Sequence, residues 1–437
     1  MKIIKAGTKY IVIALITLLL CIGLFLLVNL IPRSAIISNM QESATYFDEH
    51  PLFPWEIENR PFSKADNYAD CILTQIIYQS DEKHPVRSMI LASYYQGENE
   101  NVDKAFVRTL AEGTEPNINY FRYWHGSQII LRPLFCIFSI RGVRLSLFIV
   151  TTILFILSSI LCFRKGQKVF AVSIWVALLL VQYWMAVFSL EYLTCFLLLS
   201  IQLLWLTSQG KEKRKNRMVP FFLVSGMLTS FMDFLTTETL TITIPLLYIL
   251  STDSLPERNF KNGFKTVGKA ILAWGIGYGG MFLAKWGLAY AFLGKDAFME
   301  AWQQAVYRIS GAVTADNTAE GSIVSLGAQL FGCIWRNLYC MFALPTEVKA
   351  STVMVLWGIL LFLLFSFWYL FRKEGATDGQ KVWLLLIGGI PFIRFLLLRN
   401  HAYMHYFFTY RALAATLLAM ILFLSQTVEV RKKKRKR

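Results

Sequence analysis

Charged residues are scarce in this chain of 437 residues. Asp, Glu, Lys and Arg make up 16% of it and hydrophobic residues 55%, whereas a soluble domain carries roughly 25% charged residues. The shortfall is concentrated in apolar runs of about 17–25 residues, the length that crosses the hydrocarbon core of a bilayer. This composition excludes an ordinary soluble protein and indicates a polytopic membrane protein, with the lipid bilayer as its first partner.

The spacing of the cysteines and the positions of the basic residues argue against two kinds of function. The 7 cysteines are scattered without a CxxC motif or zinc-like spacing, so cysteine chemistry is not a lead. The net charge of +16 is of the kind that nucleic-acid-binding proteins carry. Here, however, the basic residues cluster in short segments between apolar runs, which is the pattern of membrane-orientation signals. We therefore expect no nucleic acid as a partner.

Ten apolar runs predict ten membrane spans. The first, residues 10–31, follows the basic segment MKIIKAGTK and is too long for the apolar region of a signal peptide, so we expect an uncleaved helix. The other predicted spans lie near residues 143–163, 169–188, 190–208, 218–234, 238–251, 267–293, 352–371, 380–398 and 409–428. The pair 218–234 and 238–251 is expected to be broken or tilted, because its second member is short.

The positive charges predict the orientation of the chain. With the N-terminus in the cytoplasm, every inner segment is basic, including RKGQK (164–168), QGKEKRKNR (209–217) and the tail RKKKRKR (431–437). The sequence therefore predicts one integral domain, residues 1–437, in the plasma membrane with both termini cytoplasmic and a polybasic tail. If the apolar run 322–344 were a span, the basic C-terminal tail would lie outside the cell. We therefore interpret this run as an interfacial or re-entrant helix.

Two long segments remain on the outer side, residues 32–142 and 294–351. The first contains half of the chain's 28 acidic residues, and its stretches 86–97 and 104–113 have the apolar spacing of helices. We expect it to form a helical cap on the membrane. The predicted fold class is therefore all-α: a polytopic transmembrane bundle of about ten spans with a helical outer-loop cap.

Most of the unusual polar residues fall at the predicted outer face. Ionisable groups in a membrane core cost roughly 2.5–3.5 kcal/mol each on insertion scales, so they usually mark a site or a pathway. The candidates are Asp66, Asp70, His125, Arg132, Glu191, Asp233, Glu238, Lys285, His401, His405 and Arg411. If the segment around Asp66 and Asp70 is helical, their spacing places both carboxylates on one face.

Each of these residues also has a purely structural interpretation. Glu191 could cap its helix, Arg132 and Arg411 could extend to the interface, and the rings around residues 403–410 could form an interfacial belt. The Asp66 and Asp70 pair could lie on a solvated helix face. His401 and His405 have the spacing of metal ligands, but no carboxylate neighbours them in sequence. We therefore assign no metal site and leave a divalent metal open.

Four segments carry a resemblance to a known type of membrane protein: ADNYADC, YWHGSQIILRPL, DFLTTETLTITIPL and RNHAYMHYFFTYR. They resemble a family of bacterial polytopic membrane proteins whose layout is similar to that of the GT-C glycosyltransferases. Those integral membrane enzymes use polyprenyl-phosphate sugars. The similar layout is a cytoplasmic N-terminus, a first helix, a long outer loop with acidic residues and surface helices, and a multi-helix body.

The chain departs from that pattern in two ways. Many members carry an acidic pair soon after the first helix, whereas Asp66 lies well beyond it and YFDEH, with Asp48 and Glu49, lies closer. Which carboxylate corresponds to the catalytic one therefore stays open. The chain also lacks a C-terminal soluble domain of the oligosaccharyltransferase kind.

The resemblance implies a glycosyltransferase that moves a sugar from a polyprenyl-phosphate carrier to a cell-envelope glycan or lipid acceptor. Asp66 and Asp70 would be the catalytic carboxylates, because an inverting transfer needs a base to deprotonate the acceptor hydroxyl. Cations would stabilise the departing phosphate. The implied substrate-binding residues are His125, Arg132, Asp233, Glu238, Lys285, His401, His405 and Arg411.

Two other functions remain open at this point. A transporter or flippase for a lipid-linked or anionic substrate would distribute charges through the depth of the membrane. A non-catalytic envelope-assembly protein with a GT-C-like body would tolerate the loss of the acidic pair. The sequence shows few charges in the inner half of its predicted spans, which favours the enzyme over the transporter.

Overall fold

The computed structural model describes residues 2–252, 260–313, 323–373 and 379–429. Most of these residues are helical, and turns and loops join the helices. The strands described are β1 (Ser93–Tyr94) and β2 (Ile118–Asn119), which pair in one small antiparallel sheet, beside isolated β-bridges. The predicted all-α class is confirmed.

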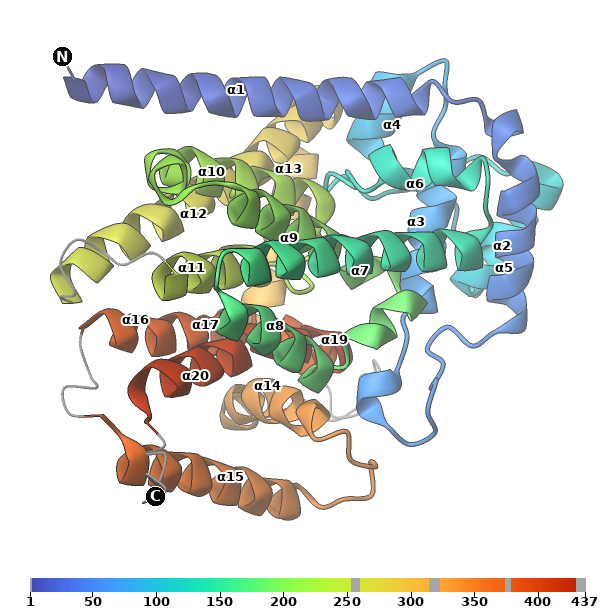
Figure 1. The fold of residues 1–437 in the computed structure, drawn as a ribbon. Coiled ribbons are helices and arrows are strands. Elements are labelled where there is room, and N and C mark those ends of the chain that lie inside the picture. Colours follow the sequence, from blue (N-terminus) through green and yellow to red (C-terminus); the bar gives the residue numbers. More distant parts are fainter. Residues whose placement is uncertain (1, 253–259, 314–322, 374–378, 430–437) are drawn as a thin grey trace, which may run out of the picture.

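Residues 32–142, predicted to lie on the outer side, fold mainly into short elements at one end of the molecule. They are η1 (Arg33–Ala35), α2 (Ile37–Glu49), η2 (Pro61–Ser63), α3 (Asn67–Gln79), α4 (Pro85–Leu91), α5 (Val102–Glu112) and α6 (Gln128–Phe135), together with β1 and β2. We call α2–α6 the first-loop helices. Figure 1 shows them gathered where α1 (Lys2–Asn29) finishes, at the end of the bundle opposite to the start of α1.

Longer helices form the body. They are α1, α7 (Ile140–Arg164), α8 (Lys168–Leu180), η3 (Tyr183–Phe188), α9 (Leu190–Ser208), α10 (Lys211–Met232), α11 (Leu240–Thr252) and α12 (Phe260–Leu293). The chain continues through α13 (Lys295–Ser310), α14 (Leu326–Met341), α15 (Ala350–Phe371), α16 (Gly379–Gly388), α17 (Ile390–Leu397), α18 (Arg399–Met404), α19 (Tyr406–Thr409), η4 (Tyr410–Leu413) and α20 (Ala414–Thr427).

Among the described residues, six helices are long and apolar enough to cross a membrane. They are Gly7–Asn29, Ile140–Arg164, Leu190–Ser208, Phe260–Leu293, Ala350–Phe371 and Tyr406–Thr427. Of two shorter apolar helices, Lys168–Leu180 covers only the first part of the predicted span 169–188, whereas Leu240–Thr252 matches the short predicted run 238–251. The structure therefore confirms membrane-type helices, and it supports six of full length rather than ten.

Two predicted spans differ from the structure for visible reasons. The run 218–234 belongs to α10, whose first residues KEKRKNR are charged and polar, so the helix as a whole is not apolar. The run 380–398 is divided between α16 and α17 around Gly389, with Pro391 in the first turn of α17. Proline lacks the amide that would continue the helical hydrogen bonds, so one long helix is not favoured there.

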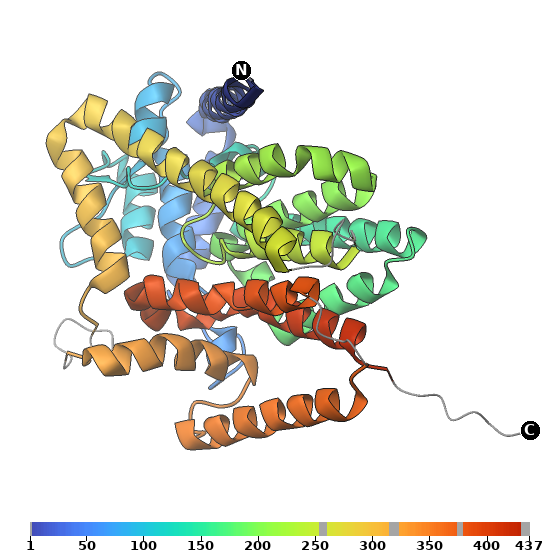
Figure 2. The ribbon, with the colours of Figure 1, turned by 90° about the vertical axis from the view of Figure 1, so that its left-hand side faces the viewer.

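The core connects the first-loop helices with the body. One cluster of buried apolar side chains includes Phe47 of α2, Ile76 of α3, Leu199 of α9 and Leu418 of α20. Helix α9 is central, because 83% of its most apolar 18-residue stretch is buried. In α15, only 6% of the corresponding stretch is buried. Figures 1 and 2 both show α15 at the edge of the bundle, where its apolar side chains have the exposure expected of a lipid-facing helix.

Candidate functional site

The start of α3 carries the two acidic residues that the sequence singled out. Asp66 is the N-cap of this helix, and its Oδ1 accepts a hydrogen bond from the Ala69 amide at 2.8 Å. A capping carboxylate is a favoured start signal because it satisfies an amide that lacks a partner within the helix. Asp70 follows in the first turn, and both side chains are buried.

Both carboxylate oxygens of Asp70 accept hydrogen bonds from other helices. Arg144 of α7 donates to its Oδ2, with Nε at 2.8 Å and Nη2 at 2.6 Å, and Arg144 also donates to Asn67. The amide of Leu190, at the start of α9, lies 3.0 Å from Oδ1 and 2.9 Å from Oδ2. Asp70 therefore joins α3, α7 and α9, and its position is that of a structural anchor beside the site.

Asp66 faces a different group. Its carboxyl lies beside the carboxyl of Glu191 in the first turn of α9, and a hydrogen bond between the two requires one of them to be protonated. Oε2 of Glu191 has no hydrogen-bond partner among the described residues. Burial and the negative charge of Asp70 raise the pKa of Asp66 to about 7. This carboxyl can therefore exchange a proton near neutral pH.

Asp66 and Glu191 line a cavity of ≈ 180 Å³. Its wall brings together residues from the first loop, α9 and the two later outer segments. The lining residues are Phe53, Asp66, Tyr68, Ala69, Asp70, Ile72, Leu73, Tyr120, Tyr123, His125, Glu191, Phe234, Arg308, His401 and His405. We call this space the acidic cavity. The structure thus places six of the predicted candidates around one volume: Asp66, Asp70, His125, Glu191, His401 and His405.

A cation from α13 completes the wall. Nη1 of Arg308, on α13, lies 3.3 Å from Nε2 of His405, and no ion pair between described residues involves Arg308. Burial and the charge of Arg308 lower the pKa of His405 to about 3, so this histidine is neutral. A neutral His405 accepts from Arg308 and leaves the guanidinium charge without a carboxylate partner in the described structure.

A second charge pair lies behind the histidines. Arg394 of α17 forms an ion pair with Glu238 (Nε to Oε1, 2.8 Å), and its Nη2 lies 3.4 Å from Nδ1 of His401. Asp233 accepts from the amide and hydroxyl of Thr236 and so closes its own turn. Asp233 and Glu238 are therefore absent from the wall of the acidic cavity, and they support the loop and the His401 ring instead.

His125 reaches the acidic cavity through an unusual backbone conformation. Its φ is 54°, in the left-handed region that non-glycine residues rarely adopt. Its Nε2 contacts the Tyr120 carbonyl at 3.0 Å, and its buried Nδ1 has no hydrogen-bond partner among the described residues. Backbone strain of this kind is found where a fold holds a side chain in place for a function.

An apolar groove adjoins the acidic cavity. The groove has a volume of ≈ 330 Å³, lies along α12 and α13, and shares Tyr123 and Arg308 with the cavity. Its other lining residues include the aromatic rings Tyr278, Phe282 and Trp286. Leu283 and Ile309 in its wall are exposed, and α12 is of membrane-spanning length. The arrangement suits an amphipathic ligand with its charge at Arg308 and its hydrocarbon part along α12.

Three predicted cations lie away from the acidic cavity. Arg132 is fully buried and donates to the main-chain carbonyls of Ile31, Ile77 and Ser80, which ties the end of α1 to the end of α3. Lys285 donates to the carbonyls of Met89 and Ile90 at the end of α4. Because these donors already hold the backbone, we no longer assign them to substrate.

Arg411 follows the same pattern. It is fully buried, donates to the carbonyls of Phe407 and Phe62, and lies over the ring of Tyr192 with 4.5 Å to the centroid. Both guanidinium amino groups are therefore engaged by the fold. We assign the role expected of these cations to Arg308 instead.

The alternative carboxylate Asp48 is also elsewhere. It forms an ion pair with Lys104 of α5 at 2.5 Å, and the two side chains are 33% and 54% exposed. Its neighbour Glu49 is exposed. Of the candidate first-loop bases, only Asp66 combines burial, a neighbouring carboxyl and contact with the acidic cavity.

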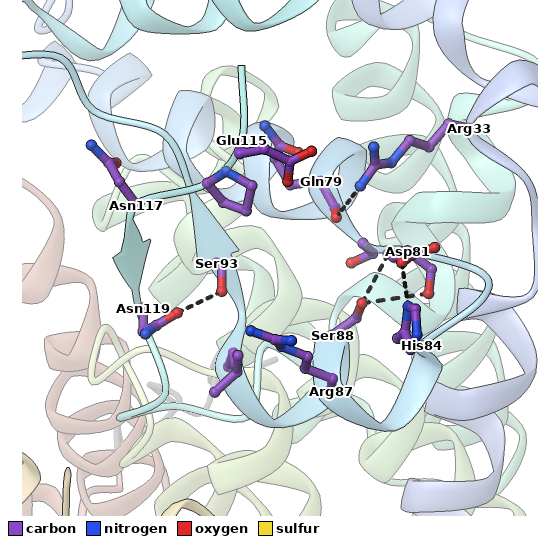
Figure 3. A pocket seen from close by; sticks show the side chains of 13 residues that line it. Arg33, Gln79, Asp81, His84, Arg87, Ser88, Ser93, Glu115, Asn117 and Asn119 are labelled. Carbon is purple, nitrogen blue, oxygen red and sulfur yellow. Dashed lines mark hydrogen bonds and ion pairs between the residues drawn. The ribbon is translucent and has the colours of Figure 1, made fainter. Parts of the chain in front are cut away.

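A separate polar hollow lies at the other end of α3. It has a volume of ≈ 310 Å³, and Figure 3 shows Arg33 and Gln79, the Asp81–His84 pair and Asn119 with Ser93 around it. Asp81 is 2.7 Å from His84, and the hydrogen bond from His84 lowers the pKa of Asp81. The acids of this hollow are paired or exposed, so it does not offer the buried carboxyl chemistry of the acidic cavity.

Sequence reasoning missed two arginines. Arg308 lies in AVYRISG, within an outer segment of mixed composition, and no local pattern distinguishes it. Arg394 lies in IPFIRFLLL, and a lone cation in an apolar run is a signal that should have been used. Only the tertiary structure brings Arg308 to His405, because nearly a hundred residues separate them.

Comparisons with family models, curated proteins and solved structures return no match for this chain. The resemblance to the GT-C glycosyltransferases therefore stays a prediction from the sequence. Among the described residues, no group of three or more His, Cys, Asp and Glu side chains is arranged to hold a metal ion. We accordingly name no metal ligands. The functional argument depends on the geometry of the acidic cavity and the groove.

Proposed function

We propose that the chain is a membrane glycosyltransferase that transfers a sugar from a polyprenyl-phosphate carrier to a cell-envelope acceptor. The observation that carries the proposal is the junction of the acidic cavity with the apolar groove. A pair of neighbouring carboxyls lies on one side of the junction, and a cation without a carboxylate partner among the described residues, Arg308, lies at the boundary. A lipid-linked sugar phosphate consists of a sugar, a phosphate and a hydrocarbon chain in that order. These three parts fit the acidic cavity, Arg308 and the apolar groove.

Asp66 acts as the general base. The acceptor hydroxyl gives its proton to Asp66 while its oxygen forms a bond to the anomeric carbon of the sugar. The bond from that carbon to the phosphate oxygen breaks, and its electron pair stays on the phosphate. The raised pKa of Asp66 suits this role, because a base is most effective when its pKa lies near the working pH. Glu191 positions Asp66 through the hydrogen bond between the two carboxyls.

Arg308 stabilises the leaving phosphate. An arginine guanidinium donates two parallel hydrogen bonds to phosphate oxygens, and its charge offsets the negative charge that develops there. Neutral His405 holds the guanidinium in place. The isoprenoid chain lies along the rings of the groove on α12, where the wall is exposed to lipid.

The proposal also fixes the orientation of the molecule. The first-loop helices and the acidic cavity lie on the outer side of the plasma membrane, with both termini in the cytoplasm. The remaining predicted spans then cross as shorter or broken helices. Lipid-linked carriers reach an outer-face site by lateral diffusion, which is why the groove has to open between helices rather than into water.

Replacing Asp66 tests the proposal. Asp66→Asn nearly preserves shape but removes the proton acceptor, so release of polyprenyl phosphate from a polyprenyl-phosphate sugar should fall by roughly 10²–10⁴-fold. The assay uses the purified full chain in lipid, a panel of hexosyl and pentosyl carriers, and envelope glycan as acceptor, with mass spectrometry of the lipid product. Asp48→Asn is the matched control, because it makes the same change at an exposed first-loop aspartate.

The outcomes separate the three functions. Unchanged turnover in Asp66→Asn would remove the base from the mechanism and leave the assembly role as the better one. Turnover by neither wild type nor variant, together with uptake of the carrier across sealed vesicles, would identify a transporter. Retained binding of polyprenyl phosphate in Asp66→Asn, with its loss in Arg308→Ala but not in Lys295→Ala on the same helix, would assign the phosphate to Arg308.

A further inference from the structure

A second large cavity lies at the end of the bundle away from the first-loop helices. It has a volume of ≈ 690 Å³ and is bordered by α1, α10, α11 and α12. Tyr10, Met218, Val219 and Ile249 supply apolar lining, and the first residues of α10 and α12 supply the charged part. We call it the basic cavity. None of its residues takes part in the acidic cavity or the groove.

The charge of the basic cavity is strongly positive. Its lining includes Lys211, Arg214 and Lys215 from α10 and Lys265 and Lys269 from α12, against the single carboxylate Glu212. Arg214 is buried, donates to the Gln209 carbonyl at 2.7 Å and lies over the ring of Tyr248, so it is part of the framework. The four lysine side chains are exposed and are therefore available to a ligand.

The start of α10 adds to this positive potential. Helix α10 begins at Lys211, so its N-terminus lies beside the cavity, whereas Lys265 and Lys269 lie further along α12. The amide groups of a first turn and the helix dipole favour negative charge. Lys211 in this first turn adds positive charge where the dipole is already positive, and an anion in the cavity would offset that cost.

The position of the basic cavity points to a membrane lipid. Helix α10 has 22 residues, about 33 Å at the rise of an α-helix, and ends next to Asp233 on the far side of the bundle. This is about the thickness of a bilayer's hydrocarbon core, so α10 separates the basic cavity from Phe234 in the acidic cavity by about the distance between the two headgroup levels. Basic pockets between spans at this level take lipid phosphates, and the apolar lining takes the start of the acyl chains.

We propose that the basic cavity binds the phosphate headgroup of an anionic membrane lipid in the leaflet opposite to the acidic cavity. Phosphate is the shared chemistry of such a headgroup and of soluble phosphates, and the apolar lining favours the lipid. The site is independent of the proposed glycosyl transfer, because its residues contact neither the acidic cavity nor the groove.

Two matched double variants on α10 test the site. Lys211→Ala with Lys215→Ala removes two cations that line the cavity, whereas Lys213→Ala with Arg217→Ala removes two exposed cations with the same spacing that do not line it. Native mass spectrometry of the full chain with phosphatidylglycerol or phosphatidylcholine measures binding. The first pair should weaken phosphatidylglycerol binding by about 30-fold, at about fivefold for each cation, and the second pair by much less.

Lys265→Ala with Lys269→Ala on α12 should weaken binding as the first pair does, which guards against a local effect on α10. An equal loss in both α10 pairs would overturn the site, because it would reflect net charge alone. Equal binding of phosphatidylcholine would overturn the need for an anion. Displacement of phosphatidylglycerol by inorganic pyrophosphate at equal concentration would overturn the lipid in favour of a soluble phosphate.

Discussion

The acidic cavity and the basic cavity are built in opposite ways. The charged groups of the acidic cavity come from segments far apart in the chain, and its carboxylates and histidines are held by hydrogen bonds inside the fold. The cations of the basic cavity come from two short stretches, 211–215 and 265–269, and four of the five are exposed lysines. One site is built from groups held by the fold, and the other is a ring of mostly exposed cations.

The difference teaches what each site is suited to do. Proton transfer and stabilisation of a developing charge need groups fixed before the reaction, because reorganisation during the reaction costs free energy. Recognition of a lipid phosphate needs only positive potential at the right depth, which mobile lysines supply. This difference agrees with our proposals of catalysis at the acidic cavity and of lipid binding at the basic cavity.

The largest expected effect is a difference in the labelling of cysteines placed near the two cavities, because we propose that these cavities face opposite sides of the membrane. In a Cys136→Ala background, which removes the one exposed cysteine, we expect a membrane-impermeant maleimide to label Lys83→Cys on intact cells. Lys213→Cys, beside the basic cavity, should be labelled only after the cells are opened. Labelling of Lys213→Cys from outside would reverse the orientation, and labelling of both positions would show that the two cavities do not lie on opposite faces.

A second effect tests the framework of the acidic cavity. Arg144→Met leaves the buried carboxylate of Asp70 without its cation, so the free energy of unfolding should fall by about 3–5 kcal/mol. Denaturation of the purified chain in detergent measures it. Adding Asp70→Asn should recover part of the loss, because no charge then remains unpaired. Lys104→Ala, which breaks the exposed pair with Asp48, is the control and should change little.

The smallest expected effect is a pH dependence of stability and turnover that arises from Asp66. Changes to the cations of the basic cavity should not alter it. The pKa of Asp66 is raised from 3.8 to about 7, so the folded state holds a proton that the unfolded state has lost between these values. Stability from this group is therefore present at low pH and is lost as pH rises through about 7. Turnover should move the other way and fall about tenfold per unit below pH 7, because the base must be ionised.

Asp66→Asn distinguishes the source of this dependence. Its unfolding free energy should change less with pH between 4 and 7 than that of wild type, whereas the Lys211 and Lys215 double variant should keep the wild-type profile. A profile unchanged by Asp66→Asn would assign the titration to another group and would weaken the role of Asp66 as a base.

Much of the framework was predictable from local patterns. Helix α9 occupies the predicted span 190–208, and α15 and α7 lie within a few residues of their runs, because a continuous apolar segment of this length is itself the signal. The pair Asp66 and Asp70 was identified because carboxylates near a predicted membrane surface are costly. Their division into base and anchor was not, because it depends on Arg144 and Glu191 from other helices.

The predicted cations show where local patterns end. Arg132, Lys285 and Arg411 were chosen for their type and depth, and each proves to donate to main-chain carbonyls. A sequence shows that a cation is buried at a membrane surface, but it does not show whether backbone or ligand receives its protons. Arg308 was passed over for the converse reason, since its segment carries no unusual local cost.

By itself, the sequence determined that the chain is a helical membrane protein, which segments are apolar, and where basic residues mark one face. These properties depend on composition and on short-range periodicity, which are present in the chain before it folds. Only the tertiary structure decided that Asp66 lies beside Glu191, that Arg308 meets His405, and that a groove adjoins the acidic cavity. Those contacts join distant segments, and their strength comes from burial that no single segment can create alone.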